Sequence, residues 1–265
     1  MVIIGEKING AIPKIGEAIA MRDEANISGL AKKQEEAGAD YIDVCAGSNP
    51  EIEFDTLCWL IDVVQNVSTK PICIDSPDPN ILARVFLRTK QPGIINSISG
   101  ERNKCEILLP ILRDNPEWQV MALCCDNTGI ATTIDEKVCI ASRLIERAAA
   151  YGVAPERIHI DPLVLSIAAV NDSALQFCAA MKQIKQKYPT VRLAAALSNV
   201  SFGMPARSLV NCNFLTMAML SGLDTVIADP TNRAVISNIF ATEALMGRDH
   251  CCRSFNKAYR NGNIS

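Results

Sequence analysis

Short apolar runs rich in Ile and Val recur along the chain, and a polar residue ends each of them. Each run is followed by a stretch whose apolar residues are spaced as on one face of a helix, so strands and helices should alternate. The runs predict eight strands, at Val2–Ile8, Tyr41–Ala46, Pro71–Ile74, Gly93–Ile98, Gln119–Cys124, Arg157–Ile160, Arg192–Leu197 and Thr225–Ala228.

The stretches between these strands carry the spacing and the start signals of helices. One of them has apolar residues at positions i, i+3, i+4 and i+7, namely Ala141, Leu144, Ile145 and Ala148. Asp78 precedes Pro79, a pairing that suits the N-cap and first turn of a helix. Asn171-Asp172 predicts a second helix start, for a helix that runs toward Lys187.

Strands that are apolar throughout belong to a parallel sheet buried on both faces. Eight strand-helix units in about 250 residues is the usual size of a (β/α)8 barrel, also called a TIM barrel. An open doubly wound sheet usually has fewer units and often carries a G-x-G-x-x-G turn after its first strand, which this chain lacks. We therefore predict a TIM barrel that occupies residues 1–265 as a single domain, with a loosely held tail at Arg248–Ser265.

The composition narrows the class of protein. An apolar share of 49% can fill a large core, and a net charge of -3 without a Lys/Arg block predicts no nucleic-acid partner. No apolar run approaches the ~20 residues of a membrane helix, and the first residues lack the basic start of a signal peptide, so we expect no membrane association. The eleven cysteines are an odd number, which suits reduced thiols in the cytoplasm better than a disulfide framework.

Polar residues close the predicted strands, where a barrel of this kind places its chemistry. They are acids, amides and serines: Glu6 and Asn9, Asp43, Asp75 and Ser76, Asn96 and Ser97, Asp126 and Asn127, Asp161, Ser198 and Asn199, and Asp229. Singly, each is explained as a turn residue or a helix N-cap. Together they predict an acceptor-rich mouth, suited to a ligand with several N–H donors or to a metal ion held by oxygen ligands.

Few basic side chains accompany this set. Lys7 is the one lysine beside a strand end, which weakens a Schiff-base reaction. The two histidines, His159 and His250, lie inside a strand and in the tail, so they build neither a Ser-His-Asp triad nor an H-E-x-x-H zinc site. We expect His159 to be a core or outer-face residue.

Seven fragments, in order along nearly the whole chain, are similar to one family: Gly5-Glu6-Lys7-Ile8-Asn9-Gly10, Gln34-Glu35-Glu36-Ala37-Gly38-Ala39, Tyr41-Ile42-Asp43-Val44, Ile74-Asp75-Ser76, Ile95-Asn96-Ser97, Asp161-Pro162-Leu163 and Leu197-Ser198-Asn199-Val200-Ser201. They resemble the pterin-binding methyltransferases. These are the methyltetrahydrofolate:corrinoid protein methyltransferases of anaerobes and the folate-binding module of cobalamin-dependent methionine synthase. Dihydropteroate synthase is a more distant relative, whose Ser-Arg-Lys type of motif near the seventh strand is missing here.

The resemblance implies that tetrahydrofolate or 5-methyltetrahydrofolate binds with its pterin in the barrel mouth. The substrate-binding residues that it implies are Asp43, Asp75, Asn96, Asp126, Asp161, Ser198 and Arg207. Among them, Arg207 would meet the benzoyl-glutamate tail, and a carboxylate would accept the pterin N3–H and 2-amino group together. The catalytic residue that it implies is Asn199, whose amide would donate to N5 as the N–CH₃ bond breaks.

The methyl partner of this family is the cobalt of a corrinoid. Cobalamin modules carry an Asp-x-His-x-x-Gly motif that is missing here, so the resemblance implies a corrinoid on a separate protein that docks at the barrel mouth. A homodimer is also usual in the family.

Three alternatives stay open on the residues alone. The methyl group can move from folate to the corrinoid protein, or from methylcorrinoid to tetrahydrofolate in the demethylation of betaine or methoxyaromatics. The protein can also be a non-catalytic pterin-binding subunit. A third reading is a Mg²⁺-dependent lyase that uses Asp43, Asp75 and Asp161 as ligands.

Overall fold

Eight parallel strands form the centre of the molecule in a computed structural model that describes residues 1–264. They are β1 Val2–Asn9, β2 Tyr41–Cys45, β3 Ile72–Asp75, β4 Ile94–Gly100, β5 Gln119–Asp126, β7 Ile158–Asp161, β8 Arg192–Ala196 and β9 Thr225–Ala228. The strands pair in the order β4-β3-β2-β1-β9-β8-β7-β5, and a further pairing of β4 with β5 closes the ring. The predicted TIM barrel is confirmed, and each predicted strand end lies within two residues of its observed position.

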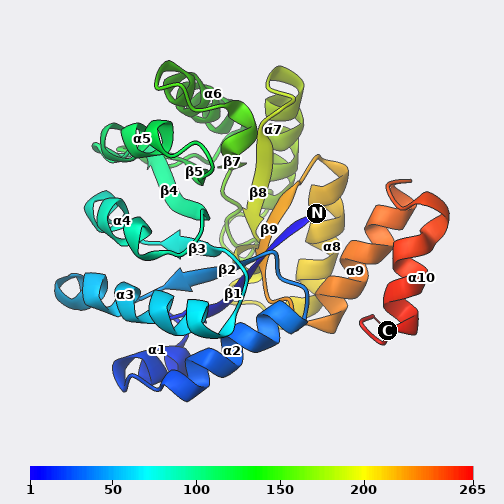
Figure 1. The fold of residues 1–265 in the computed structure, drawn as a ribbon. Coiled ribbons are helices and arrows are strands. Elements are labelled where there is room, and N and C mark those ends of the chain that lie inside the picture. The colour runs from blue at the N-terminus through cyan, green and yellow to red at the C-terminus, as the bar shows by residue number, and fades with distance from the viewer. Residues whose placement is uncertain (265) are drawn as a thin grey trace.

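Helices join the strands and surround the ring (Figure 1). In residues 1–264 the α-helices are α1 Pro13–Ala20, α2 Glu24–Glu36, α3 Pro50–Val67, α4 Pro79–Val85, α5 Lys104–Asp114, α6 Ile134–Ala150, α7 Ser173–Lys187, α8 Arg207–Leu220, α9 Arg233–Leu245 and α10 Arg253–Arg260. Short 3₁₀ turns are η1 Phe86–Arg88, η2 Pro155–Arg157, η3 Leu197–Ser201 and η4 His250–Cys252. No helix in this part of the chain is both long and apolar enough to cross a membrane.

Both predicted helix starts are confirmed. The Asp78 side chain caps α4 and accepts the N–H of Asn80 at 2.8 Å, and α7 begins at Ser173, directly after the predicted Asn171-Asp172 start. At α4 this short polar side chain supplies an acceptor that the first turn of a helix lacks, whereas the Asp172 side chain makes no such cap at α7. These local signals therefore place the helices where the sequence predicts them.

A two-residue strand, β6 (Gly129–Ile130), turns back on the end of β5. It pairs antiparallel to β5, so that Asp126 lies opposite Gly129. Gly129 takes a φ of 116°, a conformation that suits glycine. Hydrophobic periodicity does not reveal so short a strand. The strand nevertheless matters for the site, because it pairs with Asp126.

Two apolar clusters lie on the two sides of the strand ring. The larger one joins strand residues such as Ile42 and Val120 to helix residues such as Leu60 and Leu144. The buried members of the smaller one all come from strands: Ile4, Cys73, Ile94, Met121 and Ala194. Because side chains alternate between the two faces of a strand, the larger cluster fills the space under the helices and the smaller one fills the barrel interior.

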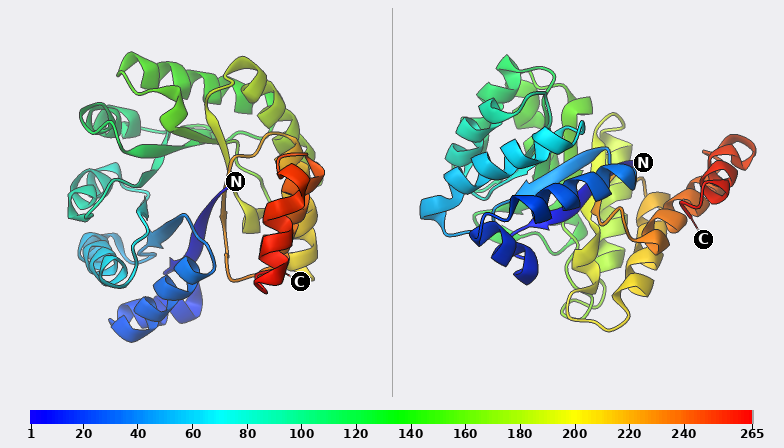
Figure 2. Two further views of the ribbon diagram at one scale, coloured as in Figure 1. Left: turned by 45° about the vertical axis from the view of Figure 1, so that its right-hand side comes forward. Right: turned by 60° about the horizontal axis from the view of Figure 1, so that its bottom comes forward.

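The prediction of a loosely held tail at Arg248–Ser265 is wrong for the part that the structure describes. This segment forms η4 and α10, and α10 lies against α9 on the outside of the helix ring (Figure 2). Ala258 and Ile264 are 4% and 3% exposed. A few apolar anchors in a polar segment are enough to dock it, and the last residue lies outside the described part.

The turn after β1 shows how closely the loops of the mouth pack. The N–H of Gly10 donates to the Cys45 carbonyl at 3.0 Å, and a Cβ added to Gly10 would lie 1.9 Å from the Ala46 carbonyl oxygen. Both contacts are with backbone, which cannot move aside as a flexible side chain can.

We therefore expect Gly10→Ala to lower the free energy of unfolding by about 1–3 kcal/mol. Gly29→Ala is the matched control, because the space beside Gly29 in α2 is open and alanine is the better helix former, so stability should rise by about 0.5–1 kcal/mol. Urea unfolding followed by circular dichroism measures both. Wild-type stability of Gly10→Ala would contradict the packing described.

Candidate active site

The inner wall of the barrel changes from apolar to polar toward the carboxyl ends of the strands. The inner cluster contains Ile4 on β1, Cys73 on β3 and Ile94 on β4. Side chains alternate along a strand, so the residue two positions later faces the same way. Those later residues are Glu6, Asp75 and Asn96.

Strand register places two more carboxyl groups on this wall. Residues paired in register on neighbouring strands point to the same face of the sheet. Asp43 pairs with Cys73 of the inner cluster, and Asp161 pairs with Leu123, which packs against that cluster. Asp75 also pairs directly with Asn96, and the charge of Asp75 acts on Asp43. The barrel thus brings the predicted residues Asp43, Asp75, Asn96 and Asp161 to one end of its interior.

Asp43, Asn96 and Asp161 are buried and Asp75 is half-buried, and the protein supplies few donors to these side chains. Asp43 and Asp161 are each 3% exposed, and Asn96 is 8% exposed. Asp161 Oδ1 accepts the N–H of Leu163 at 2.7 Å. Asp43 Oδ1 is buried and has no hydrogen-bond partner among residues 1–264. A buried carboxyl oxygen without a donor costs free energy until a ligand supplies one, so the wall fits a ligand that carries N–H groups.

Burial shifts the ionisation of these acids in one direction. It raises the pKa of Asp75 and of Asp161 to about 6. It also raises the pKa of Asp43 well above its usual range, and the neighbouring charge of Asp75 adds to that rise. Donors that reach the carboxyl groups stabilise their charged forms. Ionisation of the wall and binding of an N–H-rich ligand therefore favour one another.

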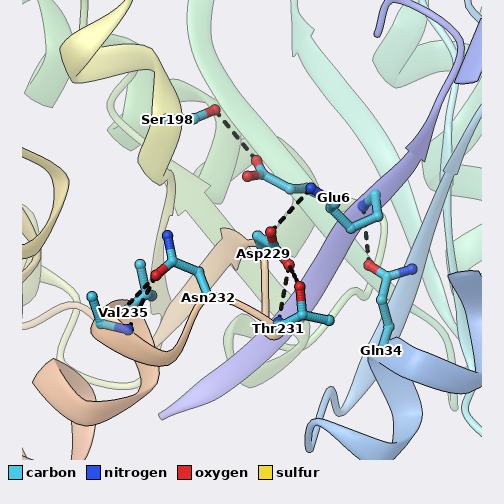
Figure 3. A network of polar contacts seen from close by, with 9 residues as sticks. Glu6, Gln34, Ser198, Asp229, Thr231, Asn232 and Val235 are labelled. Atoms are coloured by element: carbon cyan, nitrogen blue, oxygen red, sulfur yellow. Dashed lines mark hydrogen bonds and ion pairs between the residues drawn. The ribbon is translucent and has the colours of Figure 1, made fainter. Parts of the chain in front are cut away.

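Glu6 is a further acid of this mouth, and the predicted set of site residues does not include it. Figure 3 shows Glu6 and Ser198 pointing toward one another, and Ser198 Oγ donates to Glu6 Oε2 at 3.3 Å. Burial raises the pKa of Glu6. Lys7 Nζ pairs with Asp229 at 3.0 Å. Thr231 Oγ1 donates to the same aspartate at 2.6 Å (Figure 3). The strand-end position of Glu6 was visible in the sequence, but its contact with Ser198, 192 residues away, was not.

The short turn η3 carries the predicted catalytic residue. Asn199 is exposed in it, and its side chain makes no hydrogen bond within residues 1–264. Arg207, the first residue of α8, is bound to the same turn. Its Nη2 donates to the Ser198 carbonyl at 2.7 Å, and its Nε donates to Ser201 Oγ at 3.1 Å. The structure therefore brings Ser198, Asn199 and Arg207 together, with Arg207 engaged in holding the turn.

Asp126 does not join this group. Leu123 faces inward on β5, so Asp126, three positions later, faces outward. Its carboxylate accepts from Thr128 Oγ1 at 2.6 Å and pairs with Arg143 of α6 at 2.7 Å. The hydrogen bonds from Thr128, followed by that from Arg143, lower the pKa of Asp126 to about 2. Asp126 thus lines an outer cavity of about 620 Å³ between the hairpin and α6.

His159 is a core residue, as predicted. It is fully buried on β7, where its ring contacts Thr225 Oγ1 at 2.9 Å and Gln119 Oε1 at 2.7 Å, and burial lowers its pKa to about 3. Within the described residues, no three His, Cys, Asp or Glu side chains are grouped as a metal ion would require.

Comparison with known proteins agrees with this geometry. A family model described as pterin binding enzyme matches residues 13–229, so the chain belongs to the family of pterin-binding enzymes. Among its relatives is the methylcorrinoid:tetrahydrofolate methyltransferase of Eubacterium limosum, which is 49% identical over 100% of this chain and 98% of that protein. The methionine synthase of Mycobacterium leprae is 28% identical over 90% of this chain, which spans 21% of the length of that synthase.

Solved structures confirm the fold. A dihydropteroate synthase of Xanthomonas albilineans in complex with 4-aminobenzoic acid superposes with a TM-score of 0.71 at 16% identity, over 94% of this chain and 93% of that one. A dihydropteroate synthase of Yersinia pestis superposes with a TM-score of 0.69 at 14% identity, over 93% of this chain and 94% of that one.

We expect Asp161→Asn to stabilise the free protein at pH 8. Burial raises the pKa of Asp161 from 3.8 to about 6, so the native state binds the proton more tightly than the unfolded state. The stability from this group is therefore present below about pH 4 and is lost as the pH rises through 6. Asparagine has no charge to bury and keeps an acceptor for Leu163, so thermal unfolding should show a higher Tm than wild type at pH 8 and a smaller difference at pH 5.

Asp126→Asn is the control of opposite sign. Its lowered pKa means that its stabilisation is present at neutral pH and is lost as the pH falls through about 2. This variant should therefore be slightly less stable than wild type at pH 8. If Asp161→Asn has the Tm of wild type at pH 8, the charged Asp161 carboxylate does not destabilise the free protein.

Proposed function

We propose that this protein is a methyltransferase that moves a methyl group between N5 of tetrahydrofolate and the cobalt of a corrinoid held on a separate protein. The observation that carries the proposal is the inner wall of the mouth, where strand register gathers Asp43, Asp75 and Asp161 and where Asp43 Oδ1 is buried without a donor among residues 1–264. The full-length likeness to the Eubacterium limosum enzyme, whose name states this reaction, supports it. Residues 1–265 would act in it as one pterin-binding domain.

The chemistry of a pterin matches this wall. Its N3–H and 2-amino group form one edge with parallel donors, which a carboxylate accepts in bidentate fashion. We assign Asp75 and Asp161 to these donors. Asn96 is suited to the ring positions that need both a donor and an acceptor, because its amide offers each. Asp43 lies one level deeper than Asp75, and we assign it a supporting role in the pterin site.

Asn199 is assigned to the reacting nitrogen. When methyl moves from cobalt to folate, the N5 lone pair forms the new bond, cobalt keeps the electron pair of the broken bond, and N5 releases its proton. In reverse, N5 regains a proton as its bond to methyl breaks. An amide can accept from N5–H or donate to N5, so one contact lowers the barrier in both directions. Ser198 and Arg207 hold the turn that presents this amide.

The direction that we propose is from methylcorrinoid to tetrahydrofolate, which is the order in the name of the Eubacterium limosum relative. The exposed position of Asn199 leaves N5 accessible to a large planar cofactor on another protein. We propose that the corrinoid protein docks transiently over the mouth and that the enzyme works as a homodimer in a reducing, anaerobic cytoplasm. All eleven cysteines are unpaired, as thiols in such a compartment would be.

Asn199→Ala should slow methyl transfer by about a hundred-fold or more while the Kd for tetrahydrofolate stays within a few-fold of wild type. The reason is that the contact strengthens in the transition state and adds little to ground-state binding. Stopped-flow transfer between methylcobalamin and tetrahydrofolate measures the rate, and Asn213→Ala, an exposed asparagine on α8, is the control. Near-normal turnover of Asn199→Ala would remove this residue from the mechanism.

Calorimetry with tetrahydrofolate and an absorbance assay of methyl transfer separate this function from two rival functions. Our proposal predicts micromolar binding that EDTA does not change, because carboxylates and an amide hold the pterin directly. Binding that disappears with EDTA and returns with Mg²⁺ would favour the lyase. Binding without any transfer to or from free cobalamin, followed by the visible absorbance of the corrinoid, would favour a non-catalytic carrier.

A further inference from the structure

Lys137 is a buried lysine without a carboxylate partner among residues 1–264. It is the fourth residue of α6 and is 1% exposed. Its Nζ donates to three carbonyl oxygens, those of Ala131 at 2.7 Å, Pro162 at 2.6 Å and Leu163 at 2.8 Å. An ammonium group has three N–H donors and a neutral amine has two, so this arrangement requires the charged form.

The three carbonyl groups belong to two loops of the mouth. Ala131 follows β6, whereas Pro162 and Leu163 follow Asp161 at the end of β7. Leu163 has a φ of 57°, a left-handed conformation that a residue with a side chain adopts at a cost. Its N–H donates to Asp161 Oδ1 and its carbonyl accepts from Lys137. One strained residue therefore joins the buried ammonium group to the buried carboxyl group.

The charge of Lys137 also reaches Asp161. It opposes the burial that raises the pKa of this aspartate. The other groups that face Asp161 are the Cys124 thiol of β5, whose own pKa burial raises, and the backbone N–H of Ala196 on β8. Besides Asp161 and Cys124, the charge of the neighbouring Glu136 acts on Lys137. Lys137 is therefore the one cation that acts on Asp161 in the described part of the chain.

We propose that Lys137 is a positioning residue for pterin binding. It holds the loop after β7 so that Asp161 faces the barrel interior, and its positive charge favours the anionic carboxylate that accepts the pterin donors. It acts through Asp161 and does not touch the ligand. This role rests on the proposed function and names a residue that neither the family resemblance nor the sequence pattern indicates.

The test is the pH dependence of tetrahydrofolate binding, measured by anaerobic calorimetry between pH 5 and pH 8. Binding needs the charged Asp161, so affinity is present above the pKa of this group and is lost as the pH falls through it. Removal of the lysine charge raises that pKa. Lys137→Gln, which keeps two N–H donors, should therefore lose affinity at a pH about one unit higher than wild type does.

Three further variants separate charge, loop contacts and general stability. Lys137→Met should show the same shift and, because the loop is no longer held, a Kd about ten-fold higher at pH 8. Lys137→Arg keeps the charge and should lose affinity at the same acidic pH as wild type. Lys185→Met is the matched control: Lys185 Nζ donates to the Val191 carbonyl at 2.7 Å and pairs with Asp224 at 2.8 Å, near the amino-terminal ends of the strands. Lys185→Met should leave unchanged both the Kd at pH 8 and the pH at which affinity is lost.

The outcomes are distinct. A folded Lys137→Gln that binds tetrahydrofolate as tightly as wild type, and loses affinity at the same pH, would overturn the inference. If Lys137→Met does not fold, Lys137→Gln alone still tests the inference. The same series includes Asp161→Asn. Wild-type binding by Asp161→Asn, or no binding of tetrahydrofolate by the unaltered protein, would overturn the proposed site and function instead. Loss of binding in Asp161→Asn together with an unshifted Lys137→Gln would leave the function standing and remove Lys137 from it.

Discussion

The burial of carboxyl groups that have few hydrogen-bond donors is the constraint on which the site depends. A parallel barrel holds its strands by backbone hydrogen bonds and by apolar packing under the helices, so it can tolerate a locally unfavourable inner wall. Asp43, Asp75 and Asp161 occupy such a wall, and burial raises the pKa of each. The free energy that this arrangement costs in the free protein is recovered when a ligand brings its own donors, which is how stability is commonly exchanged for binding.

Two cations near the mouth, Lys137 and Arg207, bind backbone carbonyl groups and leave the acids of the inner wall free to bind a ligand. Lys137 binds the carbonyl groups of Pro162 and Leu163, and Arg207 binds the carbonyl of Ser198. Each cation therefore orders a loop without forming an ion pair with the inner wall. An ion pair with Asp75 or Asp161 would satisfy that carboxylate within the protein and leave less for a ligand to gain.

Much of the fold was predictable because buried parallel strands are apolar throughout and end at polar residues. The inward position of Asp75 and Asn96 follows from counting two residues beyond the inner cluster. The same count along β5 predicts that Asp126 faces outward. The short strand β6, which pairs with the end of β5 at Asp126, leaves no periodic signal in the sequence. The burial of Lys137 could not be predicted, because a lysine in a helix is normally exposed to solvent. Only the folded chain brings three carbonyl groups to its Nζ. The docked tail was missed because its few apolar anchors stand among charged residues.

The central claim is that the free protein holds these acids partly protonated and that a pterin completes them. It is tested most directly by titrating the protein with 6-methylpterin, which carries the pterin edge without the folate tail, in two buffers of different ionisation enthalpy. Near pH 6 we expect a net release of protons on binding, because donors draw Asp75 and Asp161 into their charged forms, and we expect this release to fade by pH 8. Binding without proton release near pH 6, or with proton uptake, would contradict it.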